Sequence, residues 1–132
     1  MNKPFKFKQF TIEQDRCAMK IGTDGVLLGA WVSLKNNPFS ILDIGAGTGI
    51  IALQLAQRSN AEIVDALEID ENAYEQCVDN FENSPWGDRL FCYHASLEEF
   101  VEEKCRPVEI HIFIHIHHKF NNIGVVIRED KI

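Results

Sequence analysis

The chain has 132 residues, 45% hydrophobic and 25% charged, which is typical of one globular domain. No run of eighteen apolar residues occurs and the lysine-containing start lacks an apolar signal segment, so neither a membrane-spanning helix nor a secretory leader is expected. The four cysteines are irregularly spaced without a C-x-x-C pair, which argues against a zinc site and is typical of reduced thiols in the cytoplasm.

Charge is distributed unevenly along the chain. The formal net charge is −7, which taken alone argues against a nucleic-acid partner. Residues 1–20 nevertheless hold five basic and two acidic residues, a local charge of +3, which leaves −10 for the other 112. The basic residues are Lys3, Lys6, Lys8, Arg16 and Lys20. Phe5, Phe7 and Phe10 interleave with them, which suits a surface that stacks on bases and pairs with phosphates. The alternative interpretation is a solvated arm with a few anchoring aromatic residues.

Helical and strand patterns alternate along the rest of the chain. A short helix is expected at 26–31, capped by Thr23 or Asp24. Apolar runs and amphipathic stretches then predict strands at 39–44, 62–68 and 89–94, and helices at 48–58, 71–81 and from 97 onward. This alternation predicts an α/β fold, in which crossover helices join the strands of a parallel sheet.

Two of the expected helices carry additional signals. The apolar face of the helix at 71–81 consists of Ala73, Tyr74, Cys77, Val78 and Phe81. Ser96 and Glu99 have the spacing of a capping box, which starts a helix by pairing each side chain with the backbone N–H of the other residue.

Residues 110–117 follow a different pattern, with isoleucines on one face and mostly histidines on the other. Strict alternation predicts a half-exposed strand, whereas inner strands of a parallel sheet are buried on both faces. His115 and His117 are close enough to share a metal ion, but no cysteine or carboxylate completes a clear set of ligands. We therefore expect no functional metal site.

A glycine-rich turn, L-D-I-G-A-G-T-G at residues 42–49, lies between a predicted strand and a predicted helix. This is the setting of a nucleotide-binding turn, where glycines permit positive φ and let a ligand approach the backbone. Ile50 occupies the position where the dinucleotide fingerprint has its third glycine, which disfavours pyrophosphate binding.

Glu68 ends the second predicted strand, twenty-one residues after Gly47. A carboxylate at this point can accept hydrogen bonds from both hydroxyls of a ribose. The alternative is that Glu68 and Asp70 merely cap the following helix, where negative charge is favourable. The glycine turn at the appropriate distance favours ribose binding.

Together, the glycine turn and the L-E-I-D sequence at 67–70 resemble the S-adenosylmethionine turn and ribose acid of class I methyltransferases. The segments at 5–10, 14–20 and 22–31 are more specific, because they are similar to the bacterial tRNA1(Val) adenine-N6 methyltransferases, which modify the adenine beside the anticodon. N-F at 80–81 and S-P-W at 84–86 also resemble that family. The resemblance covers residues 4 to about 104.

The resemblance implies a Rossmann-like class I methyltransferase fold that binds S-adenosylmethionine. The resemblance implies that the turn under the methionine end of the cofactor is formed by Gly45, Gly47 and Gly49, with Asp43 nearby. Glu68 would hold the ribose. The segment implied to close over the cofactor contains Lys20, Thr23 and Asp24. Ser96 stands where the family usually has an acidic residue near the cofactor adenine. The basic N-terminal residues implied to meet valine tRNA are Lys3, Lys6, Lys8 and Arg16.

The family's catalytic motif is missing from this sequence. Family members end the fourth strand with N-P-P-Y or N-P-P-F, whose polar groups orient the target amine while the ring stacks the flipped base. This chain has four prolines and no Pro-Pro pair, so no catalytic residue is assigned. The residues after Lys104 do not resemble the family, and we expect an atypical tail at 105–132 that arises from a shifted reading frame or a truncated gene copy.

We therefore expect residues 1–132 to form a single partial methyltransferase domain, incomplete at its C-terminus. The implied function is S-adenosylmethionine-dependent methylation of N6 of adenine-37 in tRNA1(Val), in the cytoplasm, without an obligatory protein partner. One alternative is an inactive module that binds cofactor or RNA. A second alternative is a methyltransferase that acts on another amine or amide.

Overall fold

The computed structural model describes residues 3–17, 23–35, 37–104, 111–117 and 122–128, with side chains for 3–17, 25–35 and 37–103. The elements are β1 (Phe5–Lys6), β2 (Thr11–Ile12), α1 (Thr23–Trp31), β3 (Ser40–Ile44), α2 (Ile50–Arg58), β4 (Ile63–Leu67), α3 (Glu71–Glu82), β5 (Leu90–Tyr93), α4 (Leu97–Lys104), β6 (His111–His117) and β7 (Asn122–Arg128). Every helix and strand predicted from the alternating patterns is present, with ends that differ from the predicted ones by at most three residues.

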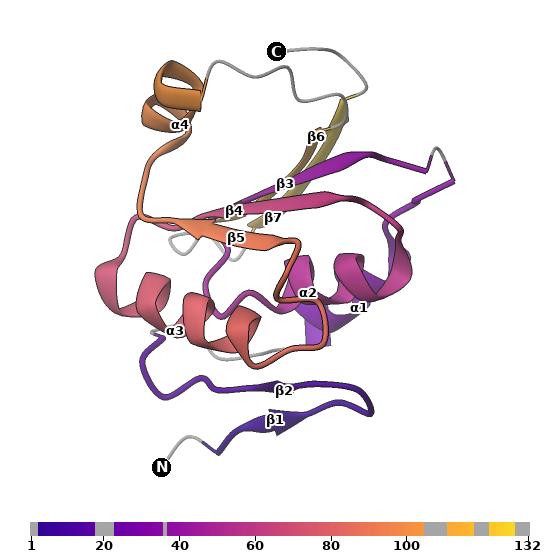
Figure 1. The fold of residues 1–132 in the computed structure, drawn as a ribbon, viewed down its shortest axis with the longest axis vertical. Helices are drawn as coiled ribbons and strands as arrows, with labels where there is room; N and C mark the ends of the chain where they lie inside the picture. The colour runs from indigo at the N-terminus through magenta and orange to yellow at the C-terminus, as the bar shows by residue number, and fades with distance from the viewer. Residues whose placement is uncertain (1–2, 18–22, 36, 105–110, 118–121, 129–132) are drawn as a thin grey trace.

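A parallel sheet in the order β3-β4-β5 forms the centre of the molecule. Helices α1, α2 and α3 cover one face, and α4 lies on the other (Figure 1). The fold is therefore an α/β, Rossmann-like arrangement, as predicted. Both faces of β3 and β4 are buried, which is why these strands have almost continuous apolar sequences.

Alternation along β3 and β4 divides the core between the two faces of the sheet. On the side of α1–α3, Ile41 and Val64 are fully buried against the helices. On the opposite side, Leu42 and Leu67 pack against Phe100 of α4. The sheet consequently holds the ends of β3 and β4 at one fixed edge.

The buried face of α3 differs from the predicted one. Its buried residues are Ala73, Gln76, Cys77, Asn80 and Phe81, whereas Tyr74 and Val78 are only half-buried. The prediction counted apolar residues alone, but Gln76 and Asn80 are buried because their amides are hydrogen-bonded to other segments. The face is therefore rotated toward the N-terminal part of the chain.

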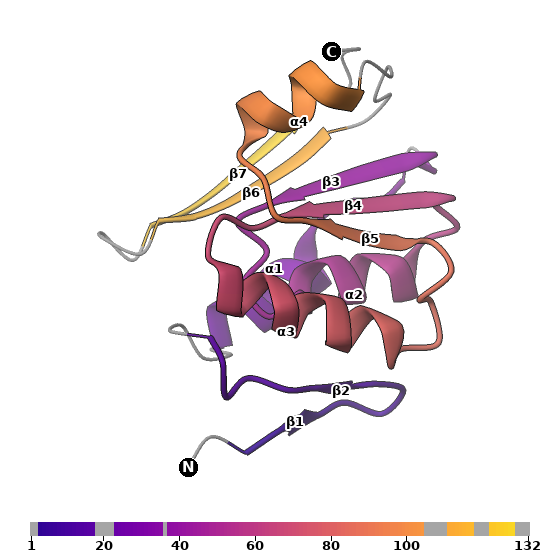
Figure 2. The same cartoon turned by 60° about the vertical axis from the view of Figure 1, so that its left-hand side comes forward.

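The N-terminal segment is a hairpin packed on the helical layer (Figure 2). Strands β1 and β2 pair in antiparallel fashion, with Phe5 opposite Ile12. Phe7 stacks on Phe10 at 4.5 Å between ring centroids, and Phe10 meets Trp86 edge-on at 5.5 Å. Because Phe10 and Ile12 are buried, this segment is anchored to the helical layer.

The last part of the chain forms an antiparallel pair, in which His111 of β6 lies opposite Arg128 of β7. This confirms the strand predicted at 110–117, apart from Ile110, which is outside the described residues. In both ribbon views β6 runs beside β3 (Figure 2). The imidazoles of His115 and His117 are likewise outside the described side chains.

Within the described residues, no helix has both the length and the apolar character needed to cross a bilayer. In the same part of the chain, no three His, Cys, Asp or Glu side chains are grouped so that they could hold a metal ion.

Candidate functional site

The site is built at the carboxyl ends of β3 and β4, where the glycine turn follows β3. Gly45, Gly47 and Gly49 have φ values of 74°, 58° and 88°, as the motif predicted. Gly45 N–H and Ala46 N–H both donate to the carbonyl oxygen of Leu67, at 2.8 and 3.0 Å. The turn is thereby fixed to the end of β4.

The three glycines have different surroundings. A Cβ added at Gly45 or Gly47 would have no other atom within 4 Å, so the turn is open on that side. A Cβ at Gly49 would lie 2.7 Å from Cε1 of Phe81 and 3.0 Å from the sulfur of Cys77. Gly45 and Gly47 therefore leave space for a ligand, whereas Gly49 permits close packing between α2 and α3.

Glu68 connects the two strand ends. One carboxylate oxygen accepts the N–H of Gly47 at 2.9 Å, and the other accepts the N–H of Asp70 at 3.1 Å. Asp70 itself caps α3, since its side chain accepts the N–H of Ala73 at 2.9 Å. Of the two acidic residues that were candidates for capping, only Asp70 makes the side-chain cap, while Glu68 belongs to the glycine turn.

Asp43 is the most unusual charged group of the site. It is 1% exposed, and its carboxylate oxygens form no hydrogen bond of ordinary geometry among the described residues, although the backbone of Ala52 interacts with them. Burial raises the pKa of Asp43 to about 7; the backbone N–H of Ala52 acts in the opposite direction, and the nearby Glu68 carboxylate adds to the rise. An unpaired buried carboxylate is costly, so a positively charged ligand group beside Asp43 would stabilise its ionised form.

The remaining predicted cofactor residues are not brought together with this cluster by any described contact. Ser96 accepts the N–H of Glu99 at 3.2 Å, and Glu99 accepts the N–H of Ser96 at 3.3 Å. The predicted capping box is thus confirmed, and the Ser96 hydroxyl oxygen serves α4. Thr23 and Asp24 begin α1, where only their backbone is described, and Lys20 lies outside the described residues.

The basic N-terminal residues fall into two groups. Lys3, Lys6 and Lys8 are exposed. Arg16 instead forms ion pairs with Asp79 and, at 3.9 Å, with Glu75 of α3. The hydrogen bond to Asp79 raises the pKa of Arg16. Its guanidinium is therefore attached to α3, unlike the ammonium groups on the hairpin.

Sequence reasoning did not single out several residues of the site. Ile69 is 72% exposed beside Glu68, although it lies only two residues beyond the end of the buried strand β4. In the sequence, its exposure was indicated by its position between two acidic residues, Glu68 and Asp70. Gln76 gave no signal of its own, because amides on a helix are ordinarily solvated, and Asn80 was noted only as part of the N-F sequence at 80–81.

Comparison with known proteins adds to this geometry. Residues 41–129 match the family model described as a methyltransferase domain. The chain is 79% identical, over 102 residues, to a tRNA1(Val) (adenine(37)-N6)-methyltransferase of Christiangramia forsetii, covering 77% of this chain and 42% of the relative. A protein of the same name from Flavobacterium johnsoniae is 74% identical over 99 residues, covering 75% of this chain and 42% of the relative. The chain thus spans about two fifths of the length of these relatives.

A solved structure agrees with the fold. The O-methyltransferase from Bacillus cereus in complex with SAH superposes with a TM-score of 0.59 at 25% identity, covering 75% of this chain and 47% of the other.

Proposed function

Because this chain belongs to the methyltransferase domain family, we propose that its glycine turn, Asp43 and Glu68 bind S-adenosylmethionine for methyl transfer to tRNA. The observation that carries the proposal is the hydrogen bond from Gly47 to Glu68, which joins the turn and the acidic residue at adjacent strand ends. In open α/β sheets, ligands bind at the carboxyl ends of the strands.

The residues present fit the cofactor in three respects. Glu68 uses two of the roughly four lone-pair sites of a carboxylate, so it retains capacity for ribose hydroxyls. Gly45 and Gly47 leave open space against the backbone. Asp43 offers a buried carboxylate without a hydrogen bond of ordinary geometry among the described residues, which an ammonium group would complement.

When bound, the cofactor supplies the methyl group that is transferred. The chain's own residues act by binding and orientation, because Glu68 and the glycine turn are fixed to each other before any ligand arrives. Such preorganisation lowers the entropic cost of holding the reactants in a productive arrangement. Exposed Ile69 provides an apolar surface beside Glu68 against which an adenine ring can pack. Ser96, Lys20, Thr23 and Asp24 remain proposed cofactor residues.

For the substrate, we propose N6 of adenine-37 in tRNA1(Val), the base named for both bacterial relatives. The exposed Lys3, Lys6 and Lys8 would contact phosphates, and Arg16 would contribute from its position on α3. A cavity of about 340 Å³, lined in part by Lys8, Phe10 and Asn83, lies beside the hairpin. We place this function in the cytoplasm, without an obligatory protein partner.

A second candidate is a module that binds cofactor and RNA without turnover. It is favoured by the lack of an N-P-P-[YF] sequence within these 132 residues, since that motif orients the target amine in the family. A transferase for another amine or amide is the third candidate, and the high identity to the tRNA enzymes disfavours it.

A transfer assay with labelled S-adenosylmethionine and unmodified valine tRNA separates these candidates. Incorporation at adenine-37 supports the methyltransferase. Binding of SAH and tRNA without incorporation supports the module, and labelling of a different amine acceptor alone supports the third candidate. Failure of the 132-residue chain to bind SAH would overturn the proposed cofactor site.

Replacing Glu68 with glutamine should weaken SAH binding by about ten- to a hundredfold, because hydrogen bonds to a charged acceptor contribute roughly 1.5–3 kcal/mol. Isothermal titration calorimetry provides the measurement. Asp70→Asn is the matched control, since asparagine also caps helices well and Asp70 has no part in the turn. Equal affinity of Glu68→Gln and the wild type would exclude Glu68 from the site.

The double variant Lys6→Ala/Lys8→Ala should bind valine tRNA more weakly, with less dependence on salt. Each lost phosphate contact reduces the slope of log K against log salt by about 0.7–0.9, so two contacts change it by about 1.5. Filter binding at several salt concentrations measures this slope. Lys35→Ala removes another exposed lysine outside the hairpin and should leave the slope unchanged. An unchanged slope in the double variant would show that Lys6 and Lys8 of the hairpin do not contact RNA phosphates.

A further inference from the structure

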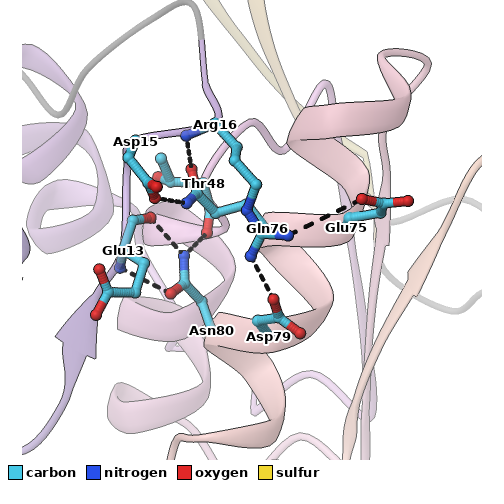
Figure 3. Close-up of polar contacts among 8 residues, drawn as sticks. All are labelled: Glu13, Asp15, Arg16, Thr48, Glu75, Gln76, Asp79 and Asn80. Carbon is cyan, nitrogen blue, oxygen red and sulfur yellow. Dashed lines mark hydrogen bonds and ion pairs between the residues drawn. The ribbon is translucent and has the colours of Figure 1, made fainter. Parts of the chain in front are cut away.

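Asn80 of α3 joins two segments that are far apart in sequence (Figure 3). Its side-chain oxygen accepts the N–H of Glu13 at 2.8 Å, and its NH2 group donates to the carbonyl of Glu13 at 2.9 Å. The same NH2 group donates to the carbonyl of Thr48, within the glycine turn, at 2.8 Å. Asn80 is 1% exposed; its bond to Thr48 is buried, and its two bonds to Glu13 are partly buried.

Gln76, one turn earlier on α3, holds the same N-terminal segment at a neighbouring point. Its oxygen accepts the N–H of Arg16 at 3.0 Å, and its NH2 group donates to the carboxylate of Asp15 at 2.6 Å. Asp79 and Glu75 flank it and pair with the Arg16 guanidinium (Figure 3). No bond from Gln76 to the glycine turn occurs among the described contacts.

The bond from Asn80 to Thr48 completes the fixation of the glycine turn. The peptide unit between Thr48 and Gly49 is held at both ends, since the Gly49 N–H donates to Ala46 at 2.9 Å while the Thr48 carbonyl accepts from Asn80. The preceding glycine, Gly47, is held by Glu68. Rotation of the Thr48 carbonyl away from α3 would therefore require loss of a buried hydrogen bond.

We propose that Asn80 is a positioning residue that couples the N-terminal hairpin to the cofactor turn. The carboxamide holds residue 13 at the end of the hairpin and residue 48 in the turn simultaneously, so cofactor binding at the turn strengthens attachment of the hairpin. By linkage, attachment of the hairpin strengthens cofactor binding to the same extent. This inference rests on the proposed function, because it requires that the turn bind the cofactor.

The test compares Asn80→Asp with Gln76→Glu. Both substitutions replace a buried amide by a nearly isosteric carboxylic acid on the same helix, and both disturb a bond to the same N-terminal segment. Only Asn80→Asp also removes a donor from the glycine turn. Calorimetric titration with SAH should show about tenfold or greater weakening for Asn80→Asp and less than about threefold for Gln76→Glu, since leaving a buried carbonyl unpaired is costly.

Hydrogen exchange of the wild-type chain gives a second readout that does not depend on a variant being folded. The Glu13 amide donates to Asn80, whereas the Phe7 amide donates to Phe10 within the hairpin, at 2.8 Å. Saturating SAH should slow exchange of the Glu13 amide at least about fivefold and affect the Phe7 amide less. A residue with a purely structural role would not produce this ligand-dependent difference.

Three outcomes would overturn the coupling: unchanged SAH affinity of folded Asn80→Asp, equal weakening by the two variants, or a Glu13 amide insensitive to SAH. If thermal melting shows that Asn80→Asp does not fold, the wild-type exchange experiment decides. A wild-type chain that does not bind SAH would overturn the proposed cofactor site and this inference together, whereas the three other outcomes leave the cofactor site intact.

Discussion

Gly49→Ala is expected to reduce the free energy of unfolding by about 2–5 kcal/mol. A left-handed backbone costs a residue with a side chain roughly 1–2 kcal/mol, and Gly49 has a φ of 88°. Overpacking adds roughly 1–3 kcal/mol, because the new methyl would lie 2.7 Å from the ring of buried Phe81. Urea unfolding followed by circular dichroism measures the change.

Gly45→Ala is the matched control for this prediction. Gly45 also has a positive φ, 74°, but an added Cβ meets no other atom within 4 Å. Only the backbone cost of roughly 1–2 kcal/mol should appear. If the two alanine variants are equally stable, close packing of α3 on the glycine turn is not the reason for glycine at 49.

Raising the pH from 5 to 8 is expected to destabilise the wild-type chain through Asp43, and Asp43→Asn should remove that contribution. The pKa of Asp43 is about 7 in the folded chain and 3.8 in the unfolded reference, so between these values the folded state holds the proton that the unfolded state has lost. Stability therefore falls as the pH rises through this window and levels off above about 7. Between pH 5 and 8, the titration of Asp43 is expected to lower the free energy of unfolding by about 2–3 kcal/mol, at roughly 1.4 kcal/mol per unit of pKa shift.

The measurement is the difference between wild-type and Asp43→Asn unfolding free energies at each pH. All other ionisable groups are common to both proteins, so their contributions cancel in this difference. The wild type should lose about 2–3 kcal/mol relative to the variant on going from pH 5 to 8. Parallel stability curves would show that Asp43 does not titrate in this range.

Much of the fold and part of the site were predictable from local sequence. The glycines at 45, 47 and 49 permitted a left-handed turn between a strand and a helix, and all three have positive φ. The pairing of Ser96 with Glu99 was equally local, and it starts α4 as predicted. These features depend on residues within a few positions of one another, so their spacing is visible in the sequence.

Other features depended on distant partners. The aromatic residues of the N-terminus were consistent with either a solvated arm with a few anchoring aromatic residues or an RNA-binding surface, and the structure shows that Phe10 packs against Trp86. Arg16 was grouped with the lysines, yet Asp79, sixty-three positions away, holds it on α3. The spacing of residues within one segment does not reveal which residue of a distant segment will pack against it or pair with it.

The sequence by itself therefore determined the α/β class, the order of strands and helices, the glycine turn and the family resemblance, because each follows from local spacing and chain order. The tertiary structure decided which of Glu68 and Asp70 caps a helix, which face of α3 is buried, and how Asn80 joins residues 13 and 48. The physical reason is that a buried carboxylate or amide must find hydrogen-bond partners wherever the fold brings them. Which groups become partners depends on how the fold brings distant segments together, and the spacing of residues along a single helix or strand does not predict that.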